Sequence, residues 1–153
     1  VETINRGGEH KVYAKENFNV AYRSVPIPKN EWFTSCKIEL EISTKSAVEK
    51  DIKMMLNERA LAQPLGQLSC GSVFRNPSEK HAAKLIEICG LKGKHIGGAY
   101  VSEKHANFII NMGDATSADI ERLIELVYET VYEEHAIKLI PEVRIVGASW
   151  RER

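Results

Sequence analysis

The stretch CGSVFRNP, residues 70–77, indicates how the middle of this chain folds and presents one hydroxyl at a turn. Gly71 permits a backbone turn that would strain a residue with a Cβ, so Ser72 should point outward. Asn76-Pro77 favours the start of a helix, because asparagine caps exposed N–H groups and proline lacks the one that is left unpaired there. Arg75 precedes this expected helix end, so the stretch resembles an anion cradle. Taken alone, an ordinary turn serine is the better interpretation.

The residues before this stretch predict strands and then a helix. Strands over residues 1–4 and 11–14 flank a glycine turn typical of a hairpin, and apolar-charged alternation predicts a half-buried strand over residues 36–42. Ser46, followed by Glu49, forms a capping box at the start of a helix. The apolar stripe of that helix consists of Val48, Ile52, Met55 and Leu56.

The residues after the stretch predict two helices and further strands. One helix should span residues 77–89, with Gly90 as its stop. Thr116 and Asp119 open a longer helix with apolar residues at a 3.6-residue period. Short strands should lie near residues 99–101, 107–111 and 139–146. Strands followed by mixed helices and strands predict an α+β fold.

Composition limits the class of protein. A chain of 153 residues, with 43% hydrophobic and 27% charged residues, is typical of about one globular domain. Because 21 basic residues balance 21 acidic ones, charge gives no argument for binding nucleic acid or a membrane. No apolar run reaches membrane-spanning length, and we expect a cytoplasmic protein. Cys36, Cys70 and Cys89 lack metal-site spacing, so we expect reduced thiols and no metal.

Five ordered segments resemble the family of bacterial UDP-N-acetylenolpyruvoylglucosamine reductases (MurB, UDP-N-acetylmuramate dehydrogenases). They are AYRS at 21–24, GSVFRNP at 71–77, GLKG at 90–93, GGAYVSEKHANF at 97–108 and PEVRIVG at 141–147. Five blocks in the family's order, spread over nearly the whole chain, are far more specific than any one of them. The chain is similar to the shorter variant of the enzyme, which lacks an extra loop over the substrate.

The resemblance implies that different segments of the chain belong to different domains. Residues 1–60 would complete a flavin-binding α+β region, residues 61–136 would form the substrate-binding α+β domain, and residues 137–153 would return to the flavin domain. Family members also carry an upstream glycine-rich pyrophosphate loop that nothing here matches, and the chain begins at Val1. We therefore expect the C-terminal portion of a longer protein, inactive without its N-terminal flavin-binding region.

The resemblance also implies a reaction, the FAD-dependent and NADPH-consuming reduction of UDP-N-acetylglucosamine enolpyruvate to UDP-N-acetylmuramate in peptidoglycan synthesis. Hydride reaches the vinyl carbon distal to the carboxylate, and enolate-like charge develops beside it. Such a step requires a group that stabilises the charge, a proton source and a fixed substrate geometry.

Three residues match the catalytic positions of the family. Ser72 matches the serine that protonates the intermediate. Glu142 matches an essential glutamate, useful as the neutral acid because a carboxylate would repel the enolate. Arg23 matches an arginine whose planar charge flanks the substrate carboxylate. The ordinary alternatives are a turn serine, a surface glutamate and a solvated arginine.

Other residues match binding positions. The substrate-binding candidates are Arg75, Asn76, Lys92 and His105, and the cofactor-binding candidates are Tyr22 and Arg144. Lys92 is a candidate phosphate contact, and the alternative is a solvated loop lysine. His105 stands where relatives often carry glutamine, and a structural histidine is an even alternative.

Two other functions compete with the reductase. One is an isolated UDP-sugar-binding module without turnover. The other is a serine hydrolase using Ser72 with His81 or His105, which needs a base in hydrogen-bond reach and an orienting acid. The segment around Ser72 lacks the nucleophile-elbow pattern, which disfavours the hydrolase.

Overall fold

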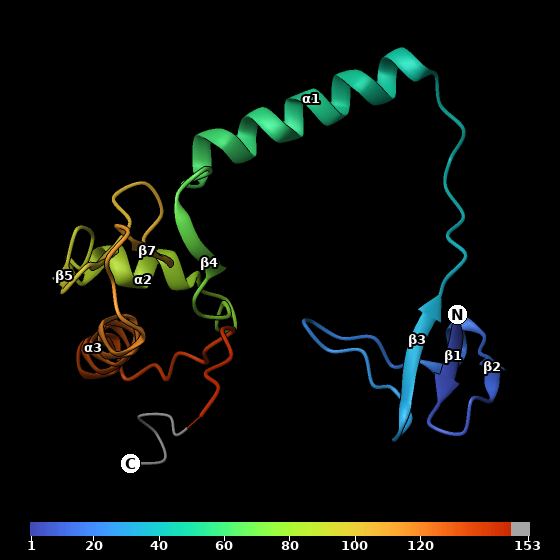
Figure 1. The fold of residues 1–153 in the computed structure, drawn as a ribbon. Helices are drawn as coiled ribbons and strands as arrows, with labels where there is room; N and C mark the ends of the chain where they lie inside the picture. Colours follow the sequence, from blue (N-terminus) through green and yellow to red (C-terminus); the bar gives the residue numbers. More distant parts are fainter. Residues whose placement is uncertain (148–153) are drawn as a thin grey trace. The chain divides into compact units, whose positions relative to one another are not determined.

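The computed structural model describes residues 1–147, and its chain divides into two compact units (Figure 1). The first is Val1–Ala47, and the second begins at Val48. No helix among the described residues is long and apolar enough to cross a membrane. The boundaries expected near residues 60 and 136 separate flavin-binding from substrate-binding segments, which the compact units do not test. That division stays a prediction.

The first unit is a small antiparallel sheet. Its strands are β1 (Glu2–Asn5), β2 (His10–Val12) and β3 (Glu31–Ser35), in the order β2-β1-β3, with a short 3-10 helix, η1 (Lys15–Asn17). Gly8 in the β1–β2 turn has φ +81°, a conformation that favours glycine. The predicted hairpin is confirmed.

A buried carboxylate lies at the centre of the first unit. Glu31 is only 7% exposed, and it accepts hydrogen bonds from Thr3 Oγ1 and Lys11 Nζ, both at 2.7 Å, and from the Tyr13 hydroxyl at 3.0 Å. The hydrogen bond from Lys11, followed by that from Thr3, lowers the pKa of Glu31. The centre of this sheet is therefore held by polar groups.

The strand predicted over residues 36–42 is wrong. Strand β3 ends at Ser35, residues 36–44 are irregular, and Ile38, Leu40 and Ile42 are 72–102% exposed. Alternation supplies one apolar face, but a strand also needs a neighbour that shares its backbone hydrogen bonds. Among the described residues, no strand pairs with this segment.

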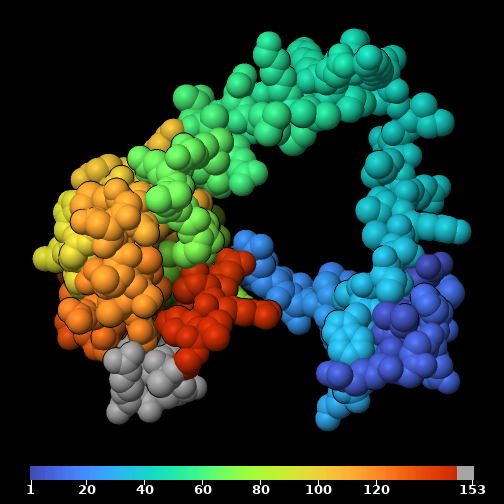
Figure 2. All heavy atoms as spheres, in the orientation of Figure 1, coloured from blue at the N-terminus to red at the C-terminus, as the bar shows by residue number. Residues whose placement is uncertain are grey.

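Helix α1 (Lys45–Ala62) confirms the predicted helix but not its cap or its buried stripe. Thr44, not Ser46, provides the cap, because its Oγ1 accepts from the N–H of Ala47 at 3.3 Å. The predicted stripe is between 44% and 58% exposed at Val48, Ile52, Met55 and Leu56. The space-filling view shows side chains standing out along this helix (Figure 2). Its stripe stays in solvent because α1 packs against none of the helices and strands that follow it among residues 63–147.

The second unit is a four-stranded antiparallel sheet with two further helices. The sheet order is β4-β7-β6-β5, formed by β4 (Leu68–Ser72), β5 (His95–Ile96), β6 (Ala99–Val101) and β7 (Phe108–Asn111). Helix α3 (Ser117–His135) packs on β5, β6 and β7, and also on α2 (Ala82–Ile88). Strands β6 and β7 were predicted, whereas β4 and β5 were not.

The predicted start of α3 is confirmed. Thr116 Oγ1 accepts from the N–H of Asp119 at 3.1 Å, and Asp119 Oδ2 accepts from the N–H of Thr116 at 3.0 Å. One face of α3 is buried in the core through Leu123, Ile124, Val127 and Val131, each no more than 2% exposed. Capping and periodicity therefore fix both the start of α3 and the face that it buries.

Residues 70–82 depart from the sequence expectation. Ser72 ends a strand, and α2 begins at Ala82 rather than Pro77. Glu79 has φ +61°, outside the helical region, so no helix can run through it from Pro77. The anion cradle is wrong, because exposed Arg75 does not precede a helix end.

The predicted strands over residues 139–146 are also wrong in extent. This segment forms a single β-bridge, between Phe74 and Pro141, and no strand is assigned to it. A proline lacks the N–H that a continued ladder would need at that position.

Candidate functional site

Ser72 follows an irregularity in strand β4. The pairing between β4 and β7 shifts register between Ser69 and Ser72, and Gly71 has φ +84°. A glycine in this conformation is typical of a bulge, which bends a strand and redirects the next side chain. Ser72 is half-buried and lies opposite Phe108. Gly71 thus redirects the side chain of Ser72, as predicted. It does so within a bulged strand rather than within a turn.

A buried asparagine holds the chain just after Ser72. Asn107 is 4% exposed; its Oδ1 accepts from the N–H of Phe74 at 3.0 Å, and its Nδ2 donates to the carbonyl of Phe74 at 2.8 Å. Its own carbonyl accepts from the N–H of Val73 at 2.9 Å. Sequence reasoning placed Asn107 in a strand and missed this role. The signal was a polar side chain between two apolar residues, Ala106 and Phe108.

The C-terminal segment lies along the other edge of residues 73–75. The N–H of Arg75 donates to the carbonyl of Ile140 at 2.9 Å. The carbonyl of Val73 accepts from two successive N–H groups, those of Glu142 at 2.7 Å and Val143 at 3.4 Å. Two residues opposite one is the pattern of a bulge. This pairing brings half-buried Glu142 beside the residue that follows Ser72.

Two binding candidates extend this site. Nδ1 of His105 accepts from the N–H of Asn107 at 3.3 Å. Burial lowers the pKa of His105, and the nearby charge of Lys92 lowers it further. The Lys92 ammonium also forms an ion pair with Glu87 at 3.1 Å. His105, Lys92 and Asn107 are therefore neighbours, with His105 favoured in its neutral form.

The remaining candidates are placed differently. The Oδ1 of Asn76 accepts from the N–H of Ala82 at 3.0 Å, so this side chain caps α2 from outside the helix. Arg23 and Tyr22 belong to the first unit, where the Arg23 guanidinium lies 5.7 Å from the centroid of the Tyr22 ring. The relation of these two residues to Ser72 stays a prediction.

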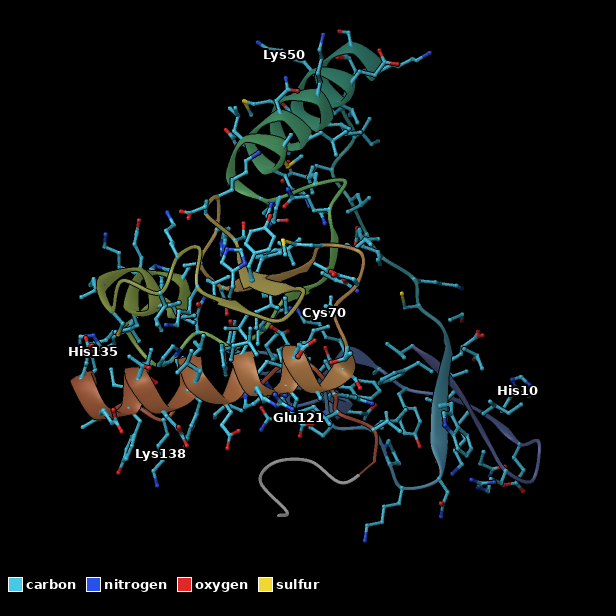
Figure 3. The ribbon with its side chains drawn as sticks, turned by 60° about the vertical axis from the view of Figure 1, so that its left-hand side comes forward. His10, Lys50, Cys70, Glu121, His135 and Lys138 are labelled. Carbon is cyan, nitrogen blue, oxygen red and sulfur yellow. The ribbon has the colours of Figure 1, made fainter. Side chains whose placement is uncertain are left out.

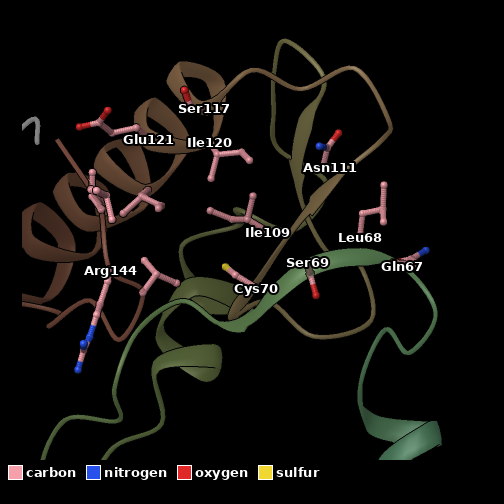
Figure 4. Close-up of a pocket in the computed structure, with 14 residues that line it drawn as sticks. Gln67, Leu68, Ser69, Cys70, Ile109, Asn111, Ser117, Ile120, Glu121 and Arg144 are labelled. Atoms are coloured by element: carbon pink, nitrogen blue, oxygen red, sulfur yellow. The ribbon is translucent and has the colours of Figure 1, made fainter.

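A cavity of about 820 Å³ lies beside β4 (Figure 4). Its lining is largely apolar, from β4, β7, α3 and residues 143–146. Arg144 contributes to the lining, but its guanidinium end is directed away from Cys70 and Ile109. The predicted flavin contacts, Tyr22 and Arg144, belong to different units, so neither unit alone forms a flavin cradle around both.

Residues 63–146 match the family model of the UDP-N-acetylenolpyruvoylglucosamine reductase C-terminal domain. The chain belongs to this family, and the predicted α+β class is confirmed.

Individual relatives agree. The UDP-N-acetylenolpyruvoylglucosamine reductase of Alkalilimnicola ehrlichii is 51% identical over 147 residues, which cover 96% of this chain and 49% of the relative. That of Legionella pneumophila (strain Corby) is 54% identical over 148 residues, covering 96% and 48%. The chain thus spans about half the length of these curated relatives. The crystal structure of the reductase (MurB) from Thermus caldophilus superposes with a TM-score of 0.78 at 30% identity, covering 94% of this chain and 50% of that one.

Proposed function

We propose that this chain provides the proton-donating and substrate-binding residues of a UDP-N-acetylenolpyruvoylglucosamine reductase. The reaction is the NADPH- and FAD-dependent reduction of the enolpyruvyl ether to UDP-N-acetylmuramate, for peptidoglycan synthesis in the cytoplasm. The observation that carries this proposal is the double hydrogen bond at the carbonyl of Val73, which joins the segment of Glu142 to the segment of Ser72. It supports a shared catalytic site for two residues that are far apart in sequence.

Ser72 is the proposed proton donor. After hydride adds to the distal vinyl carbon, the electron pair of the double bond resides on the adjacent carbon and its carboxylate. The hydroxyl of Ser72 gives its proton to that carbon, so a C–H bond forms as the O–H bond breaks. A further proton from solvent then restores the hydroxyl. An alcohol is a weak acid, so this step requires direct contact with a strongly basic carbon.

Glu142 is the proposed stabiliser of the enolate oxygen. As the neutral acid it would donate a hydrogen bond where negative charge develops. Arg23, from the first unit, is proposed to neutralise the substrate carboxylate.

The UDP-sugar is proposed to bind next to this pair. Lys92 offers a positive charge to the diphosphate, and neutral His105 offers a ring nitrogen for a hydrogen bond. With Oδ1 of Asn76 engaged at Ala82, its Nδ2 is the group that would donate to the ligand. Arg75 is exposed and would contact an anionic part of the substrate.

The flavin, when bound, supplies the hydride. Tyr22 and Arg144 are its proposed contacts, consistent with residues 1–60 and 137–153 serving the flavin side and residues 61–136 the substrate side. Because Tyr22 and Arg144 belong to different units, the steps assigned to this chain are proton transfer and substrate binding only.

A chimaera tests the proposal, with this chain replacing the matching half of the Alkalilimnicola ehrlichii reductase. In Ser72→Ala and Glu142→Gln we expect NADPH to reduce the flavin at an unchanged rate. The enolpyruvyl substrate should reoxidise it about 10² to 10⁴ times more slowly. Ser69→Ala, in the same strand, is the matched control.

Normal reoxidation in Ser72→Ala would overturn the role of the serine. Substrate binding without any turnover by the unsubstituted chimaera would favour the binding module instead. Retained flavin absorbance and circular dichroism show that each variant is folded.

A further inference from the structure

The C-terminal ends of α2 and α3 bring three potential metal ligands together. Cys89 caps the end of α2, and Glu134 and His135 are the last two residues of α3. Figure 3 marks His135 at this end of α3. A thiol sulfur, a carboxylate oxygen and a ring nitrogen from these residues all lie within 4.8 Å of one another. The cluster joins residues that are distant in sequence, which is why spacing predicted no metal site.

The ring of His135, one of the three residues of this cluster, carries an unsatisfied atom. Its Nε2 is buried and has no hydrogen-bond partner among the residues that the structure describes. Buried polar atoms in native proteins are nearly always paired, so this one indicates a missing partner. A neutral imidazole nitrogen is a common metal ligand, and a bound cation would satisfy the histidine.

Cys89 and Glu134 already interact as a donor and an acceptor. Burial, and then the hydrogen bond to Glu134, raise the pKa of Cys89 to about 11. A divalent cation bound among these three ligand atoms would displace the thiol proton: the S–H bond breaks, a sulfur–metal bond forms, and the proton passes to water. The carbonyl groups at both helix ends also favour a positive charge here.

We propose that Cys89, Glu134 and His135 form a binding site for a divalent cation of the Zn²⁺ class. A set of one sulfur, one nitrogen and one oxygen suits Zn²⁺, whereas Mg²⁺ and Ca²⁺ prefer all-oxygen sites. Three protein ligands leave a fourth tetrahedral position for water. The ion would link the end of α2 to the end of α3 and stabilise their packing. Glu134 is exposed, so its side chain can adjust to the geometry of the ion.

Cobalt(II) is the probe, because its spectrum reports both geometry and thiolate ligation. The tag-free 153-residue chain, kept reduced with a phosphine, should give tetrahedral d–d bands and a thiolate-to-cobalt charge-transfer band. Both should saturate at one ion per chain and disappear when Zn²⁺ is added. Zn²⁺ should also raise the Tm of the chain.

Three variants separate this site from binding elsewhere. Cys89→Ser should remove the charge-transfer band and the Tm shift, and His135→Gln should weaken binding at least about tenfold. Cys36→Ser, at an exposed cysteine of the first unit, is the matched control and should bind like the unsubstituted chain. Absence of the cobalt bands in the unsubstituted chain, or a charge-transfer band that persists in Cys89→Ser, overturns the proposal.

Discussion

The two compact units of this chain are stabilised in different ways. In the first, the buried residues include Thr3 and the carboxylate Glu31, while Trp32 and Phe33 are nearly half exposed. In the second, a continuous apolar core joins the sheet to α2 and α3. Every buried hydrophobic residue of the described chain lies between Val73 and Leu139. The apolar burial that drives folding is thus concentrated in the second unit, which also contains Ser72 and Glu142.

The largest expected effect is the loss of a core side chain. Leu123→Ala, at a position with no exposed surface, should lower the free energy of unfolding of the second unit by about 2–5 kcal/mol, because it leaves a cavity. Leu56→Ala, at a leucine of α1 that is 58% exposed, is the matched control and should change it by less than about 0.5 kcal/mol. Urea denaturation followed by circular dichroism measures both. Equal losses would mean that the stripe of α1 is buried in solution.

A smaller effect is expected at the asparagine that holds the chain after Ser72. Asn107→Ala leaves the buried N–H and carbonyl of Phe74 without their partners, at a cost of about 1–3 kcal/mol. Asn111→Ala, at the other end of β7, is a comparison in a less buried position. Hydrogen exchange should show faster exchange at Val73 and Phe74 in Asn107→Ala. Unchanged protection at Val73 and Phe74 would contradict the proposed role of Asn107.

The N-terminal cap of α3 should contribute less to the free energy of unfolding than Asn107 does. Thr116→Ala removes the oxygen that accepts from the N–H of Asp119 and should cost about 1 kcal/mol. Thr116→Ser keeps that oxygen and should lie within a few tenths of a kcal/mol of the unsubstituted chain. Thermal denaturation of the two variants measures the difference. A Tm of Thr116→Ala equal to that of Thr116→Ser would show that the cap does not contribute.

The smallest expected effect is the loss of stability of the first unit at acidic pH. Because the folded-state pKa of Glu31 is lowered, its contribution to stability is complete above its unfolded-state pKa, about 4.5. That contribution decreases as pH falls below this value and through the lower folded-state pKa. The partner ammonium of Lys11 is about half exposed, so solvent screening keeps the effect modest.

NMR amide shifts between about pH 6 and pH 3 follow this transition. Strands β1–β3 should lose structure at a higher pH than α3 does. Glu31→Gln should abolish the dependence in that window, and Glu16→Gln, at an exposed carboxylate of the same unit, should preserve it. Simultaneous loss of structure in both units would contradict independent stabilisation.

Sequence patterns predicted those helices and strands whose local signals agree with the way the element packs in the fold. In α3 a capping box and a 3.6-residue period specify the same helix, and both appear in the structure. The hairpin of β1 and β2 was predicted for the same reason, from its glycine turn. The pattern at residues 36–42 failed because alternation describes one segment and cannot supply its pairing partner.

The candidate site was only partly accessible to sequence reasoning. The family resemblance selected Ser72 and Glu142, but no local pattern indicated that Val73 would join their segments. Asn107 was missed because its function depends on backbone groups of Phe74, which any residue at that position would present. Asn76 does cap α2, but the helix begins at Ala82 rather than at Pro77. The residue between them, Glu79, has a left-handed backbone conformation that a helix cannot contain.

The shared carbonyl of Val73 has a consequence for motion in the second unit. Since the backbone of Glu142 is hydrogen-bonded to the chain that carries Ser72, we expect the proposed acid and hydroxyl to move together. Any movement of this segment would carry both groups together. Such a movement would thus alter their distance from the reacting carbon while their spacing from each other stays constant.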